Sequence, residues 1–171
     1  MAYHNFSAVT ADHPEEPTAA DGKICGPILS LDLGSKRVGA AASDPDLIAI
    51  TRLTSIRRSS WKQLLRDVCD LIRRLDAKTL VIGFPLSLNG NEGPAAKASR
   101  EVAYKFALSL ELPVYLQDER LTSVAAQENL AAEGFQAQAI LSRLDSESAA
   151  MILRDFIAGG QQRILVQRPL K

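Results

Sequence analysis

Histidine is nearly absent from this chain of 171 residues. The two that it has, His4 and His13, both lie in an N-terminal stretch without any apolar period, so the part of the chain expected to fold contains none. This inventory excludes Ser-His-Asp and Cys-His catalysis from the folded part, and it also excludes histidine-rich zinc sites. A catalyst there has to rely on carboxylates, lysine, arginine, hydroxyl groups or a metal ion that prefers oxygen ligands.

Cysteine and long apolar runs are also scarce. Cys25 and Cys69 form neither a disulfide framework nor a metal-binding pair, which predicts free thiols in a reducing compartment. The longest apolar stretches are too short to span a bilayer. The N-terminus lacks the charged start and apolar segment of a signal peptide. We therefore expect a cytoplasmic protein without a membrane partner.

The net charge is zero, because 20 basic residues balance 20 acidic ones, but the charges are unevenly distributed. Residues 1–26 hold four acidic residues and one lysine, which leaves 19 basic and 16 acidic residues in the remainder. That remainder has a net charge of +3, which is compatible with a polyanionic partner without being diagnostic of one.

The length suits a single domain with a hydrophobic core. Residues 1–26 are rich in alanine, proline and acids, and this composition predicts a disordered N-terminal tail. We expect one domain over residues 27–160. Residues 161–171 form a basic C-terminal tail, which is either a short strand or a flexible end.

Hydrophobic periodicity predicts the order of the strands and helices. Three strands in a meander, followed by alternating strands and helices, indicate an α/β fold with a mixed five-stranded sheet and helices on both faces. The helix that begins at Pro94 is expected to bury Ala98, Val102, Phe106 and Leu110. The predicted strands cover 28–33, 38–43, 48–56, 79–83 and 113–117, and the helices cover 61–75, a segment from Pro94, a segment from Thr122 or Ser123 to about Gly134, and a segment ending at Gly159-Gly160.

Three acidic residues lie at the ends of predicted elements. Asp32 ends the first strand, Glu119 follows the fifth, and Asp145 is expected to open the last helix. Taken singly, Asp32 and Asp145 are explained as caps and Glu119 as a partner of Arg120. Taken together they favour a metal site, because Asp32 interrupts an apolar strand and gathered carboxylates need a positive counterpart. Mg²⁺ or Mn²⁺ bound by Asp32, Glu119 and Asp145 would supply that charge and support phosphodiester hydrolysis.

Basic residues accompany two of these acids. Lys36 and Arg37 follow Asp32 closely and either contact a phosphate of the substrate or form a solvated hairpin tip. Arg120 either clamps a phosphate or neutralises the acids before it. Asp118 is a weaker ligand candidate than Glu119, because neighbouring side chains on an extended segment point to opposite faces.

Four segments, LSLDLGSKRVGAAASD, LVIGFPLSLNG, YLQDERLTS and LDSESAAMIL, occur in this order between residues 28 and 158. In sequence and spacing they resemble the YqgF family of ribonuclease-H-like nucleases. The resemblance implies a ribonuclease-H-like sheet with catalytic carboxylates at Asp32, Glu119 and Asp145. It also implies a nuclease that processes precursor 16S rRNA or, by fold analogy, a Holliday junction resolvase.

We therefore expect a metal-dependent endonuclease that acts in 5′-end processing of precursor 16S rRNA. One alternative is a resolvase that cuts four-way DNA junctions as a dimer, because a junction presents two symmetry-related strands. An alternative of another class is a non-catalytic rRNA-binding protein. The sequence does not choose between a monomer and a homodimer.

Overall fold

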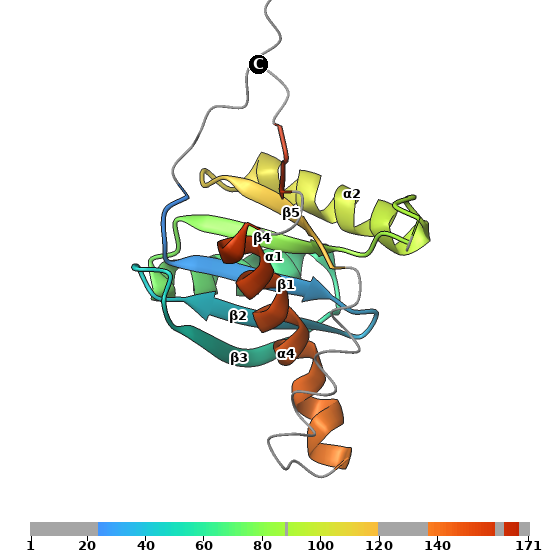
Figure 1. The fold of residues 1–171 in the computed structure, drawn as a ribbon, viewed down its shortest axis with the longest axis horizontal. Coiled ribbons are helices and arrows are strands. Elements are labelled where there is room, and N and C mark those ends of the chain that lie inside the picture. Colours follow the sequence, from blue (N-terminus) through green and yellow to red (C-terminus); the bar gives the residue numbers. More distant parts are fainter. Residues whose placement is uncertain (1–23, 88, 120–136, 160–162, 168–171) are drawn as a thin grey trace, which may run out of the picture.

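The structure is a computed structural model that describes residues 24–87, 89–119, 137–159 and 163–167, with only the backbone described at 137–144. Its sheet has the strand order β3-β2-β1-β4-β5-β6 (Figure 1), which confirms the predicted mixed α/β fold. The strands are β1 (Ile28–Leu33), β2 (Arg37–Ser43), β3 (Ile50–Arg57), β4 (Thr79–Phe84), β5 (Val114–Asp118) and β6 (Arg163–Leu165).

Strand pairing follows the predicted meander and alternation. β1 and β3 flank β2 in antiparallel pairing, whereas β4 lies parallel to both β1 and β5. The sheet has one strand more than the five predicted: β6 pairs antiparallel with β5 through the register Leu116 to Ile164. The C-terminal segment thus contains a short strand, which was one of the two alternatives for it. A strand of three residues, Arg163–Leu165, is too short for a period of two to distinguish it from a flexible end.

Helices cover both faces of the sheet. α1 (Trp61–Leu75) and α2 (Pro94–Ser109) pack on one face, and α4 (Ala137–Ala158) packs on the other (Figure 1). Alternation along β1 divides the core between these faces: Leu29 and Leu31 contact the α1 and α2 side, and Ile28 contacts the α4 side. Residues 30 and 32 have the same parity as Ile28, so their side chains are expected on the α4 face of the sheet.

The sequence accounts well for α1. Ser60 caps its start by accepting a hydrogen bond from the Gln63 backbone N–H (3.2 Å). Asp76 ends it in the left-handed region, with φ of 51°. Leu64, Val68 and Leu71 are buried at helical spacing, in the helix predicted over residues 61–75.

The buried face of α2 differs from the prediction. Phe106 and Leu110 are buried as expected, but Ala98 is exposed and Val102 is half-buried. The helix is rotated so that Ala96, Ser99, Ala103, Phe106 and Ala107 face the sheet. The buried residues have helical spacing, as the predicted ones do. Four of the five are alanine or serine, so the buried face does not stand out by its hydrophobicity.

Helix α4 begins at Ala137, so the prediction that Asp145 opens the last helix was wrong. The preceding residues, AQAILSRL, are mostly strong helix formers and extend the helix upstream. Asp145 is therefore held within a continuous helix instead of capping one. The helix predicted from residue 122 or 123 to about residue 134 lies outside the described residues.

Residues 24 and 25, which belong to the predicted N-terminal tail, contact the domain. Ile24 packs against the core on the α4 side. The Thr79 hydroxyl donates a hydrogen bond to the Cys25 carbonyl (3.0 Å). Residues 1–23 lie outside the described residues, and the tail stays a prediction there. Across the described part of the chain, no helix is long and apolar enough to cross a membrane.

Candidate active site

Asp32 and Glu119 lie on the same face and near the same end of the sheet. Asp32 is the fifth residue of β1, and Glu119 directly follows β5, which is parallel to β4 as β4 is to β1. Both have the strand parity of residues that contact α4, so their carboxylates are directed to the face that this helix covers. Asp118 is buried and has the opposite parity. It therefore belongs to the face that α1 and α2 cover, as do Leu116 and Phe84, the register partner of Asp118 on β4.

Two glycines lie on the strands next to these acids. Gly39 is the register partner of Asp32 on β2, and Gly83 lies on β4 between Asp32 and Glu119. A Cβ atom at Gly83 would be 2.6 Å from Oε2 of Glu119 and 2.7 Å from Cδ1 of Ile152. Glycine at this position therefore allows the Glu119 side chain to lie flat across β4.

The carboxyl group of Asp32 is electrostatically coupled to the other two acids. Burial and, to a lesser extent, the nearby charge of Asp145 raise its pKa to about 6, although a hydrogen bond with the Ser148 side chain opposes the rise. Burial, the largest cause, and the charges of Asp32 and Asp118 together raise the pKa of Glu119 to about 8. Such a pair of raised pKa values indicates a site where negative charge lacks sufficient compensation.

Asp145 reaches this site from α4, and its carboxylate contacts Arg37. The distance from Arg37 Nε to Asp145 Oδ2 is 3.4 Å, and both side chains are partly exposed. Arg37 follows the β1–β2 turn, so the turn supplies a cation beside the third acid. The structure thus places Asp32 near enough to both Glu119 and Asp145 for their charges to interact, and it places Arg37 next to Asp145. Arg120 lies outside the described residues.

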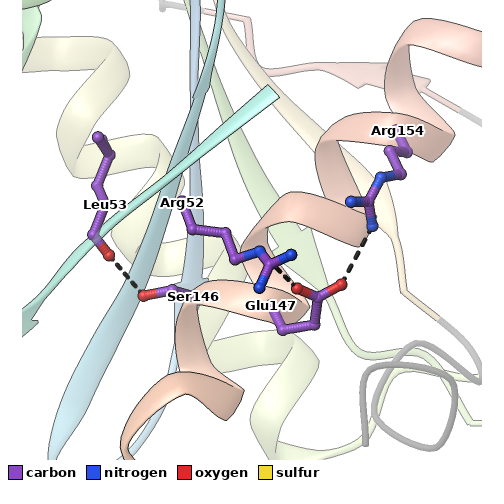
Figure 2. A network of polar contacts seen from close by, with 5 residues as sticks. All are labelled: Arg52, Leu53, Ser146, Glu147 and Arg154. Carbon is purple, nitrogen blue, oxygen red and sulfur yellow. Dashed lines mark hydrogen bonds and ion pairs between the residues drawn. The ribbon is translucent and has the colours of Figure 1, made fainter. Parts of the chain in front are cut away.

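The residues after Asp145 fix α4 to the edge of the sheet. Ser146 donates a hydrogen bond to the Leu53 carbonyl of β3 (2.6 Å). Glu147, only 1% exposed, lies between Arg52 of β3 (2.9 Å) and Arg154 of α4 (3.2 Å), as Figure 2 shows. Buried acids are normally compensated in this way, and the network fixes the position of the neighbouring Asp145.

Sequence reasoning missed Glu147. The available signal was its place between two serines in an otherwise apolar helix segment, SESAAMIL, where a solvated acid is unexpected. Its partners are distant in sequence or lie two turns further along the helix, so no local pattern identified them. Glu147 is best described as a residue that positions Asp145.

The acids present oxygen ligands, which suit a hard divalent cation better than a soft one. In the part of the chain that the structure describes, no three His, Cys, Asp or Glu side chains are close enough together to hold a metal ion. The Asp145–Arg37 contact is consistent with this separation. The oxygen donors of Asp32, Glu119 and Asp145 fit a hard divalent cation in their chemistry, although Asp145 contacts Arg37 in this structure.

Comparison with known proteins identifies the family. A profile of the RuvX family, described as Holliday junction resolvase, matches residues 26–159. The chain belongs to this family. That finding confirms the resemblance inferred from the four sequence segments and the expectation of a nuclease, because RuvX and YqgF denote the same family.

Two relatives and one solved structure agree with this assignment. A protein of Roseiflexus sp., named "Putative pre-16S rRNA nuclease", is 33% identical over 77% of this chain and 94% of its own length. A protein of the same name from Mycolicibacterium paratuberculosis is 35% identical over 85% of this chain and 87% of its own. The structure of T. thermophilus RuvC in complex with a Holliday junction substrate has a TM-score of 0.52 at 12% identity. It covers 80% of this chain and 98% of RuvC, and it supports the ribonuclease-H-like fold.

Proposed function

We propose that this RuvX-family nuclease is a divalent-metal-dependent endonuclease that processes precursor 16S rRNA, with Asp32, Glu119 and Asp145 as its acidic site. The names of the two relatives support the substrate. The observation that carries the site assignment is the coupling of Asp32 to both other acids, since the charge of Asp145 raises the pKa of Asp32 and the charge of Asp32 raises that of Glu119.

Asp32, Glu119 and Asp145 would hold Mg²⁺ or Mn²⁺, which supplies Lewis-acid chemistry for phosphodiester hydrolysis when bound. Asp32 is central, because it interacts with acids on either side, and Ser148 orients it through their hydrogen bond. Glu119 is held over Gly83 by β5. Arg37 neutralises Asp145 in the absence of ligands. A metal ion bound by Asp145, or a phosphate group bound by Arg37, would replace this ion pair.

A second candidate substrate is a four-way DNA junction. The description of the RuvX family favours it, and the assembly would then be a homodimer with two acidic sites. Asp32, Glu119 and Asp145 would have the same roles in both cases. The substrates therefore have to be distinguished by experiment.

The experiment offers a precursor 16S rRNA fragment and a synthetic junction to the purified protein with Mg²⁺ or Mn²⁺. We expect the wild type to cleave the rRNA fragment, and Asp32→Asn and Glu119→Gln to lose cleavage. The RNA affinity of both variants should be unchanged or slightly higher than that of the wild type, because a negative charge near phosphate is removed. Glu101→Gln, a matched change at an exposed position of α2, should cleave normally. A folded Glu119→Gln protein that cleaves like the wild type would refute the assignment. Preferential cleavage of the junction would favour the second substrate.

A further inference from the structure

An open pocket of about 600 Å³ lies beside the acidic site, between the β1–β2 turn and the end of β3. Every side chain that lines it is either cationic or a hydroxyl, and neither an acid nor an apolar side chain takes part. Its lining consists of Ser35, Lys36, Arg37, Ser55, Arg57 and Arg58.

Two of these arginines lie opposite each other on neighbouring strands. Arg37 of β2 and Arg57 of β3 are register partners, and both side chains are exposed. Like charges directly opposite each other destabilise an antiparallel pair. Asp145 offsets part of this repulsion at Arg37, and an anion bound between the two guanidinium groups would offset the remainder.

A third arginine, Arg58, lines the pocket and connects the two segments that form it. Arg58 Nη1 donates a hydrogen bond to the Gly34 carbonyl (2.9 Å), and its backbone N–H donates to the Lys36 carbonyl (3.0 Å). These two bonds fix the β1–β2 turn against the end of β3. Lys36 of the turn and Arg57 of β3 thereby line one cavity, together with Ser35 and Ser55.

The acids around the pocket lie outside its lining. Asp145 contacts Arg37 from the α4 side. Asp67 and Asp70 of α1 line a neighbouring groove that also includes Arg57, and Asp70 is paired with Arg73. The pocket itself therefore keeps an excess of positive charge directly next to the acidic site.

We propose that this pocket binds a backbone phosphate of the substrate strand, adjacent to the phosphodiester that is cleaved. Planar guanidinium groups suit phosphate oxygens, and serine hydroxyls add neutral donors. Arg37 connects the two sites, because it lines the pocket and contacts Asp145. The identity of the strand rests on the proposed function, whereas the phosphate recognition does not.

The test measures binding of a fluorescently labelled single-stranded RNA in EDTA, so that no cleavage takes place, over a series of salt concentrations. Arg57→Gln and Lys36→Gln should each weaken binding by about fivefold at low salt. Each should also reduce the slope of log K against log salt by about 0.7, the value for one phosphate contact on a single strand. Arg57→Lys should restore the slope, because it restores the charge.

The control is Lys78→Gln, which removes one positive charge at the opposite end of the sheet, just before β4. It should leave the slope unchanged. Arg57→Gln should melt at the wild-type temperature or slightly above it, because like-charge repulsion is relieved. An Arg57→Gln protein that is folded and keeps the wild-type affinity and slope would overturn the proposal.

The outcome separates this proposal from the proposed function. If the wild type cleaves neither the rRNA nor the junction while Arg57→Gln still lowers the slope, the phosphate pocket stands and the nuclease assignment fails. If the wild type cleaves and the slope is unaffected by Arg57, only the pocket is refuted. Inorganic phosphate serves as a third probe: competition by phosphate that is lost in Arg57→Gln would indicate recognition of the phosphate group alone.

Discussion

The backbone carbonyl of Asp145 lies directly against Gly39, so closely that a Cβ atom at residue 39 would overlap it. Gly39 is also the register partner of Asp32. One glycine on β2 therefore determines both how near α4 approaches the sheet and how near Asp145 comes to Asp32. The electrostatic coupling between these two acids depends on that approach.

Gly39→Ala should disrupt this arrangement. The added methyl group meets backbone rather than a flexible side chain, so α4 has to shift, and such overpacking costs about 1–3 kcal/mol or more. We expect a lower melting temperature and a loss of nuclease activity. Gly93→Ala is the control, because a Cβ atom there meets nothing within 4 Å. Equal melting temperatures for the two variants would show that α4 does not depend on residue 39.

Gly83→Ala should affect activity more than stability. Its Cβ atom would meet the far ends of two side chains, Oε2 of Glu119 and Cδ1 of Ile152, and both can move. The carboxylate of Glu119 would be displaced from β4 while the sheet stays intact. Cleavage rates and melting curves measured on the same preparation should show a large decrease in rate and a small decrease in stability. A wild-type rate would mean that Glu119 does not need its place over Gly83.

The sequence was sufficient to predict five of the six strands, because their periods and turn residues are local. Asp32, Glu119 and Asp145 could be selected because each follows or interrupts an apolar segment. The contacts that position them could not be predicted, since Gly39–Asp145, Arg52–Glu147 and Ser146–Leu53 join residues that are far apart in the chain. Pairing of Arg37 with Arg57 depends on the register of β2 and β3, which includes a bulge between Val38 and Ala40.

Glu147→Gln should destabilise the protein by about 1–3 kcal/mol, because it removes the charge that two arginines share in a buried place. The measurement is thermal denaturation, with an expected decrease of about 2–4 °C for each kcal/mol in a chain of this size. Glu92→Gln is the matched control: Glu92 is also paired with an arginine, Arg100, but is 34% exposed, and such pairs contribute little. A smaller effect at Glu147 than at Glu92 would contradict the positioning role.

Two N-terminal deletions should differ. Removal of residues 1–23 is expected to leave the melting temperature and activity nearly unchanged, because this segment has no apolar periodicity to support packing. Removal of residues 1–26 also eliminates Ile24 and the Cys25 carbonyl, which contact the domain, and should lower the melting temperature. A decrease of more than about 5 °C for the shorter deletion would show that residues 1–23 contribute to packing.

The metal-free protein should become less stable as the pH rises. The pKa of Asp32 is raised from 3.8 to about 6 and that of Glu119 from 4.5 to about 8 in the folded state. Between about pH 4 and pH 8 the folded state therefore binds more protons than the unfolded state, and its stability decreases with increasing pH. Below this range both states are protonated, and above it both are ionised, so the stability lost by then is not recovered.

Glu119→Gln provides the test of that pH dependence. The variant carries no titratable group at residue 119, so in EDTA its melting temperature should decrease less than that of the wild type between about pH 6 and pH 8. At the upper end of this range it should melt at a higher temperature than the wild type, although it does not cleave. Mn²⁺ should raise the melting temperature of the wild type at this pH, because the ion binds the folded state and compensates the carboxylates. It should have a smaller effect on Glu119→Gln, and Glu101→Gln should behave as the wild type throughout. If Glu119→Gln and the wild type have the same pH profile in EDTA, the buried carboxyl of Glu119 does not cause the loss of stability at high pH. The acidic site then has to be reassigned.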